Sequence, residues 1–289
     1  MKLYLDFETV DDLNWHYLPS KSGVDGSAYY ESWPAESAIA RGDLECIENV
    51  PYGPTLDEHL DIFPAKEPNA PVHLFIHGGY WRVFSPKDFS FVARELVAQG
   101  VTVALSGYSL CPKVGIGEIV RQNRAAVKWL VDNIAGYGGD PGNITVSGHS
   151  AGGHLTAMAV LADWQGEYGL KENPIKAAVG VSGVYDLRPF PYTEVQASLQ
   201  LSREEIDRNS PIYHVRGDLP PIALLVGGDE TPEFLRQNDA FADVLARSGN
   251  RVERLDIAGA NHFEVMDGYK DPESELFRML RRTCFGEGA

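Results

Sequence analysis

Short apolar runs alternate with stretches of helical periodicity over most of the chain. Eight runs have the length and composition of strands, and the first two alternate between apolar and polar positions: residues 44–50, 59–63, 72–76, 101–105, 144–147, 178–182, 222–226 and 252–257. Helical patterns follow at residues 86–99, 117–134, 151–162, 232–248 and 273–282. This order predicts an α/β fold with a mostly parallel eight-stranded sheet, antiparallel at its start, and helices on both faces.

The chain contains no internal repeat, low-complexity tract or long linker. We therefore expect a single domain over residues 1–289. The aromatic-rich residues 1–42 are expected to form a helical arm packed on it, and residues 189–216 a cap-like insertion. Ligand sites in such sheets lie at the carboxyl ends of the strands, so the residues that follow each strand are the ones to examine.

Composition narrows the classes of partner. Of 289 residues 44% are hydrophobic, as in an ordinary globular protein, and 25 basic against 41 acidic residues give a formal charge of −16. An acidic surface repels phosphate, which argues against nucleic acid and anionic membranes and favours a small-molecule substrate. The acidic residues among the first twenty and the three cysteines predict neither a signal peptide nor a disulfide framework, so a cytoplasmic protein is expected. The oligomeric state, a homodimer included, stays open.

The most informative motif is Gly148-His149-Ser150-Ala151-Gly152, which fits G-x-S-x-G. It follows a predicted strand and opens a predicted helix, the context in which such a serine sits on a strained turn with its hydroxyl exposed. Small neighbours are needed there because strand and helix approach closely. The sequence thus predicts that Ser150 is a nucleophile rather than a helix cap.

A serine hydroxyl is a weak nucleophile and needs a base, which in this arrangement comes after an acid along the chain. His262 follows the last predicted strand and is the expected base. His214 precedes a strand, and the other histidines are interpreted as structural or surface residues. The acid is expected after residues 222–226, where Asp229 and Glu230 compete. Counting three residues from Gly227 favours Glu230 and leaves Asp229 as the alternative.

Acyl transfer also needs donors for the developing oxyanion. The segment His77-Gly78-Gly79-Tyr80-Trp81 follows the strand at 72–76 and is an HGG-type loop of the kind that lends backbone N–H groups in esterases. The expected donors are the amides of Gly79, Gly78 and Ala151. His77 is expected to brace the loop.

Residues 77–81 also resemble the HGGxW motif of the kynurenine formamidase (arylformamidase) branch of the α/β-hydrolases. Residues 51–64, 183–187 and 232–237 resemble further segments of that branch, and the likeness spans roughly residues 45–285. In that branch the acid lies two residues before the Pro-Glu-Phe stretch, which again points to Glu230, although an aspartate is the more familiar acid. The resemblance implies an α/β-hydrolase that converts N-formylkynurenine to kynurenine and formate.

The expected enzyme is thus a Ser150–His262–acid hydrolase that needs no metal or cofactor. Tyr80, Trp81 and Tyr108 are candidates for lining an aryl pocket, with core packing as the alternative for each. A carboxylesterase or thioesterase acting on small esters is the rival activity. A non-catalytic binding protein on the same scaffold is the rival from another class, but such proteins usually lose a triad residue, and all three positions are filled here.

Overall fold

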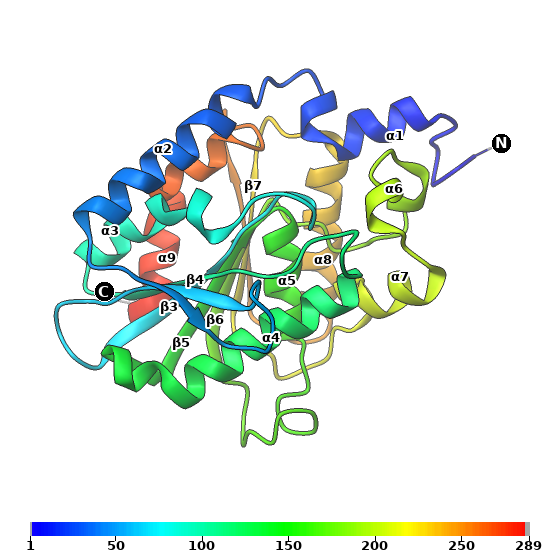
Figure 1. Ribbon diagram of the computed structural model, residues 1–289. Coiled ribbons are helices and arrows are strands. Elements are labelled where there is room, and N and C mark those ends of the chain that lie inside the picture. The colour runs from blue at the N-terminus through cyan, green and yellow to red at the C-terminus, as the bar shows by residue number, and fades with distance from the viewer. Residues whose placement is uncertain (1, 287–289) are drawn as a thin grey trace.

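An eight-stranded mixed sheet forms the centre of the computed structural model, which describes residues 2–286 (Figure 1). The strand order is β1-β2-β4-β3-β5-β6-β7-β8. The strands are β1 (Ile47–Pro51), β2 (His59–Phe63), β3 (Ala70–Ile76), β4 (Thr102–Ser106), β5 (Gly139–His149), β6 (Ile175–Val181), β7 (Ile222–Gly227) and β8 (Val252–Ile257). All eight predicted runs are strands.

The sheet changes direction where the sequence predicts it. Strand β2 pairs antiparallel with both β1 and β4, and every later pairing is parallel. The carboxyl ends of β3, β5, β6, β7 and β8 therefore meet at one edge, which is where the candidate chemistry gathers.

Helices cover both faces of the sheet. Helices α4 (Ile116–Asn133), α5 (Ala151–Val160) and α8 (Pro232–Arg247) pack on one face, and α3 (Ala93–Ala98) and α9 (Glu275–Phe285) pack on the other. Each face of the sheet has its own hydrophobic core, the first beneath α4, α5 and α8 and the second beneath α3 and α9. Strand β3 contributes side chains to both. Its Val72, Leu74 and Ile76 enter the first core and Phe75 the second, because successive side chains point to opposite faces.

Most predicted bounds differ from the structure by one to three residues, and two differ by more. The helix predicted at residues 86–99 is two 3₁₀ turns, Pro86–Asp88 and Ser90–Val92, followed by α3. Phe89 interrupts it with φ −123°, and its ring is buried against Trp33 and Phe75. Strand β5 begins earlier than its apolar run, since Gly139 already pairs with Ala70.

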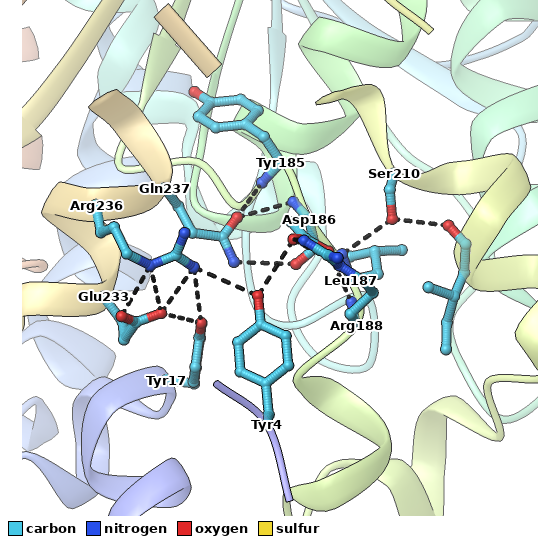
Figure 2. A network of polar contacts seen from close by, with 11 residues as sticks. Tyr4, Tyr17, Tyr185, Asp186, Leu187, Arg188, Ser210, Glu233, Arg236 and Gln237 are labelled. Carbon is cyan, nitrogen blue, oxygen red and sulfur yellow. Dashed lines mark hydrogen bonds and ion pairs between the residues drawn. The ribbon is translucent and has the colours of Figure 1, made fainter. Parts of the chain in front are cut away.

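The N-terminal arm consists of α1 (Val10–Tyr17), a 3₁₀ turn (Pro19–Lys21) and α2 (Ser27–Asp43), in blue in Figure 1. Trp33 of α2 is buried in the second core and Tyr17 of α1 in the first. A polar network shown in Figure 2 ties the arm to the body, with hydrogen bonds from Tyr17 to Glu233 and from Tyr4 to Asp186.

Residues 189–216 form short elements beside α1: 3₁₀ turns Phe190–Tyr192 and Pro211–Tyr213, α6 (Gln196–Leu199) and α7 (Arg203–Asn209). The Phe190 ring packs edge-on against Tyr17, and the Glu194 amide donates to the side chain of Asn14. This segment therefore supports the arm. Within residues 2–286, none of the helices is long and apolar enough to cross a membrane.

Candidate active site

Ser150 lies in the turn between β5 and α5, with φ 58° and ψ −119°. A non-glycine residue at positive φ is strained, and such strain is typical of a functional turn. The Ser150 amide donates to the carbonyl of Val181, 2.8 Å away, which holds the turn against β6. A Cβ on Gly152 would lie 1.9 Å from the Ile76 carbonyl oxygen, so only glycine allows this close crossing.

The loop after β3 passes directly over this turn. A Cβ on Gly78 would lie 2.7 Å from the His149 carbonyl oxygen and 3.1 Å from the Ser150 Cβ. The next residues have positive φ: 99° at Gly79, 52° at Tyr80 and 55° at Trp81. The amides of Gly78, Gly79, Tyr80 and Ala151 donate no hydrogen bond to any other described residue, which leaves unsatisfied donors beside Ser150. The Tyr80 amide was not among the expected donors.

Aromatic and histidine side chains brace this loop from beneath. The His77 ring stacks on Tyr108 with centroids 4.2 Å apart, and the Tyr108 hydroxyl lies 2.8 Å from the His77 carbonyl oxygen. Burial lowers the pKa of His77 to about 4. The Trp81 indole N–H lies 3.3 Å from Nδ1 of His154 in α5. These contacts fix the path of the loop over Ser150.

His262, in the loop after β8, is paired with Glu230. Its Nδ1 lies 2.6 Å from Oε2 of Glu230, and both side chains are almost fully buried. The other carboxylate oxygen of Glu230 accepts from the Gly227 amide at 2.8 Å and from the Ser182 hydroxyl. Glu230 is therefore held rigidly with one oxygen directed at the imidazole.

Asp229, the alternative acid, lies outside this arrangement. Its amide donates to the Ala260 carbonyl at 3.0 Å and its side chain is exposed to solvent. The turn thus directs the side chain of Glu230 inward and that of Asp229 outward.

A second histidine supports the loop that carries His262. Nε2 of His149 donates to the carbonyl oxygen of His262 at 2.8 Å, and the two ring centroids are 4.7 Å apart. Burial, followed by the neighbouring His262, lowers the pKa of His149 well below its ordinary value. A neutral His149 fixes the loop without adding a charge beside His262.

Ser150 and His262 line the same pocket, which has a volume of about 90 Å³. Gly78, Gly79 and His149 also contribute to its lining. Aromatic side chains form most of the remaining wall: Tyr30, Trp33, Tyr80, Phe84, Phe89 and Phe263. The N-terminal arm contributes Pro19, Ser20, Tyr30 and Trp33, whereas no described residue of 189–216 lines it.

The three aromatic residues proposed from sequence behave differently. Tyr80 lines the pocket, whereas Trp81 and Tyr108 are buried beneath the loop and do not. Their rings are needed to pack against His154 and His77, so core packing is the better interpretation for both. Arg82, which follows Trp81 and lines the pocket mouth, was missed by the sequence reasoning, although its place directly after the motif was a signal.

A larger cavity of about 390 Å³ lies at the amino ends of β6 and β7, beside the end of α9. It contains none of the residues discussed above, so its position is unrelated to Ser150. In the described part of the chain, no group of three or more His, Cys, Asp or Glu side chains could hold a metal ion.

Comparisons with known proteins agree with this geometry. The BD-FAE family matches residues 60–243, from β2 through most of α8. The kynurenine formamidase of Danio rerio is 30% identical over 283 residues, covering 93% of this chain and 94% of its own length, and that of Salmo salar is 32% identical over 83% of each chain.

A solved structure of a candidate thioesterase from Silicibacter sp. superposes with a TM-score of 0.82. It is 28% identical and covers 94% of this chain and 98% of its own. The family match includes more than half of the chain, with both the His77–Trp81 loop and the Ser150 turn. This protein belongs to the BD-FAE family of α/β-hydrolases and is a hydrolytic enzyme.

Proposed function

We propose that this protein is a serine hydrolase that removes a small acyl group from an aryl amine, with N-formylkynurenine as its substrate and kynurenine and formate as products. The observation that carries the proposal is the buried Glu230–His262 pair, 2.6 Å apart, in one pocket with the strained Ser150. The formamide substrate is proposed because full-length relatives at 30% and 32% identity are kynurenine formamidases.

In this proposal Glu230 orients His262 through Nδ1, so Nε2 is the nitrogen left to accept a proton. Ser150 Oγ attacks the formyl carbon while its proton passes to Nε2. Glu230 stabilises the imidazolium that forms and keeps the productive tautomer. Asp229, exposed on the same turn, has no role in this step.

The carbonyl oxygen becomes an anion in the tetrahedral intermediate. The amides of Gly79 and Ala151, with that of Tyr80, are its proposed donors, because none of them donates a hydrogen bond within the described chain. A lost oxyanion donor typically costs about 3–4 kcal/mol of transition-state stabilisation. The Gly78 amide also donates no hydrogen bond within the described chain and stays a candidate donor, and its missing Cβ lets the loop approach Ser150.

The intermediate collapses when the C–N bond breaks and His262 gives its proton to the leaving arylamine. Ser150 is then a formyl ester. A water molecule attacks that ester while His262 accepts a proton, and formate leaves as the Ser150 hydroxyl is restored. A pocket of about 90 Å³ suits a small acyl group near Ser150, with aromatic rings available to an aryl leaving group.

The test compares kcat/KM for N-formylkynurenine, p-nitrophenyl acetate and acetyl thioesters on the same preparation. We expect the formamide to be preferred by at least tenfold. A preference for either ester class would favour the rival activity. The thioesterase alternative has one observation behind it, the likeness to the candidate thioesterase from Silicibacter sp. over 94% of the chain.

A further inference from the structure

The pocket wall has a charge that is opposite to that of the protein as a whole. The formal net charge is −16, yet among the described residues that line the pocket there is no aspartate or glutamate, and Arg82 is the only lysine or arginine. Glu230 lies behind His262, outside the lining. A ligand in this pocket therefore meets one cationic side chain and a ring of aromatic surface.

The guanidinium of Arg82 has no partner within the described residues, which is uncommon among the arginines of this chain. Two other arginines are paired, as Figure 2 shows: Arg236 binds the buried Glu233 through Nε at 2.9 Å, and Arg188 binds the buried Asp186 through Nε at 3.0 Å. Both of those guanidinium groups are committed to protein carboxylates. The Arg82 side chain is exposed at the pocket mouth, and its guanidinium makes no hydrogen bond or ion pair with any residue from 2 to 286.

The backbone that carries Arg82 is fixed. Its amide donates to the Gly79 carbonyl at 3.0 Å, at the end of the loop whose φ angles are positive. The two preceding side chains are anchored, Tyr80 to the Tyr17 carbonyl and Trp81 to His154. The backbone position of Arg82 is thus set before a ligand binds, and only the side chain is left to be ordered by the ligand.

Two further observations place Arg82 near potential ligand contacts. Burial raises the pKa of both Tyr30 and Tyr80, and the charge of Arg82 offsets part of that rise, so the guanidinium is within electrostatic reach of both rings. The Trp33 indole N–H, in the same pocket wall, is buried and has no hydrogen-bond partner in the described chain. An unsatisfied buried donor is costly and is a candidate contact for a ligand oxygen.

We propose that Arg82 is the anion-recognition residue of this pocket and that the preferred substrate carries a carboxylate on its aryl leaving group. The inference rests on the proposed function for the reaction, and it adds the residue that recognises the carboxylate of the leaving group. A guanidinium pairs with a carboxylate through two parallel hydrogen bonds, a geometry that no other side chain of the lining offers. Because the lining has no acid, a substrate ammonium would gain no matching contact, so the carboxylate alone is recognised.

The experiment uses pairs of substrates in which one member carries a carboxylate and the other is neutral. The esters are 4-acetoxybenzoate and phenyl acetate, and the formamides are N-formylkynurenine and its carboxamide. The readout is the ratio of kcat/KM, charged over neutral, for the wild type and three variants. In Arg82→Gln we expect that ratio to fall about 10- to 100-fold, mainly through KM, because a charge-assisted contact is lost. Arg82→Lys should restore part of it.

The matched control is Arg281→Gln, which removes the same charge from an exposed arginine of α9 outside the pocket. Its ratio should stay within twofold of that of the wild type. A fall of the ratio in both variants alike would assign the effect to net charge and overturn the proposal. An unchanged ratio in Arg82→Gln would overturn it as well.

The ester pair separates this inference from the proposed function. If the wild type hydrolyses esters but neither formamide, the formamidase assignment fails while the ester ratio still decides the role of Arg82. If no substrate is turned over, calorimetric titration with kynurenine and with its carboxamide decides it without catalysis. Tighter binding of the carboxylate that Arg82→Gln abolishes supports the proposal, and equal binding overturns it.

Discussion

The Oε2 atom of Glu230 lies 2.6 Å from Nδ1 of His262, whereas the side chain of the adjacent Asp229 is exposed. The turn after β7 produces this difference. The Glu230 amide donates to the Gly227 carbonyl at 3.1 Å, and the Gly227 amide donates back to Oε1 at 2.8 Å. This reciprocal pair closes the turn and points the longer carboxylate at the imidazole.

Glu230→Gln should therefore lower kcat by about 10⁴-fold, the loss seen when a triad carboxylate becomes an amide. Asp229→Asn should change kcat by less than threefold, because exposed charges contribute about 0–1 kcal/mol. Steady-state rates of both variants on p-nitrophenyl acetate make the comparison. An inactive Asp229→Asn beside an active Glu230→Gln would reverse the assignment of the acid.

Ser150→Ala should abolish hydrolysis and leave stability nearly unchanged. The hydroxyl makes no hydrogen bond with any described residue, so its removal leaves no polar group without a partner. We expect less than a thousandth of the wild-type kcat and a Tm within about 2 °C. Retention of a tenth of the activity would show that Ser150 is not the nucleophile.

The order of strands along the chain and the places of the two motifs could be predicted from the sequence, because apolar runs and motifs are both local features. Apolar runs located all eight strands, and the G-x-S-x-G and HGGYW motifs lie at the ends of β5 and β3, where Ser150 and the oxyanion loop were expected. The expectation that residues 1–289 form a single domain stays a prediction.

The pocket wall could not be predicted in the same way. Its aromatic residues run from Tyr30 to Phe263, and only tertiary packing brings such distant positions together. Trp81 illustrates the limit: it follows Tyr80 and has nearly the same φ, 55° against 52°, yet Tyr80 lines the pocket and Trp81 is buried in the core. The choice between Asp229 and Glu230 depends on the rotation of one turn.

Acid should destabilise the fold through its buried histidines. Burial lowers the pKa of His73 to about 3 and those of His77 and His154 to about 4, whereas an unfolded histidine titrates near 6.5. Between these pKa values the unfolded state binds more protons than the folded state. The free energy of unfolding is therefore not reduced by these histidines above about pH 6.5, and it decreases as the pH falls toward 4. Each pKa unit corresponds to about 1.4 kcal/mol.

The unfolding free energy measured by urea denaturation from pH 7 to 4.5 checks this. His154→Gln should flatten its dependence on pH, since one buried neutral histidine is gone. His214→Gln, at an exposed site, is the control and should keep the wild-type slope. If the unfolding free energies of both variants depended equally on pH, the low pKa of the buried His154 would not be a cause of the acid sensitivity.

The last prediction concerns the contact of Tyr17 with Glu233, which secures the N-terminal arm (Figure 2). The arm supplies Pro19, Ser20, Tyr30 and Trp33 to the pocket, so loosening it should weaken substrate binding more than it slows the chemistry. In Tyr17→Phe, Glu233 keeps both of its hydrogen bonds from Nε of Arg236, at 2.9 Å each. We expect a loss of about 1–2 kcal/mol in unfolding free energy and a several-fold rise in KM with kcat within twofold.

Arg236→Met should be more damaging, because it leaves the Glu233 carboxylate buried without its cation. The expected loss is about 3–5 kcal/mol, and the double variant with Glu233→Gln should recover much of it, since no unpaired charge is left. Tyr192→Phe, an exposed tyrosine of the segment beside α1, is the control and should match the wild type in both stability and KM. If Tyr17→Phe and Tyr192→Phe gave the same KM, the arm would form the pocket wall without help from the Tyr17–Glu233 contact, because the hydrogen bond from Tyr80 to the Tyr17 carbonyl would then suffice to hold it.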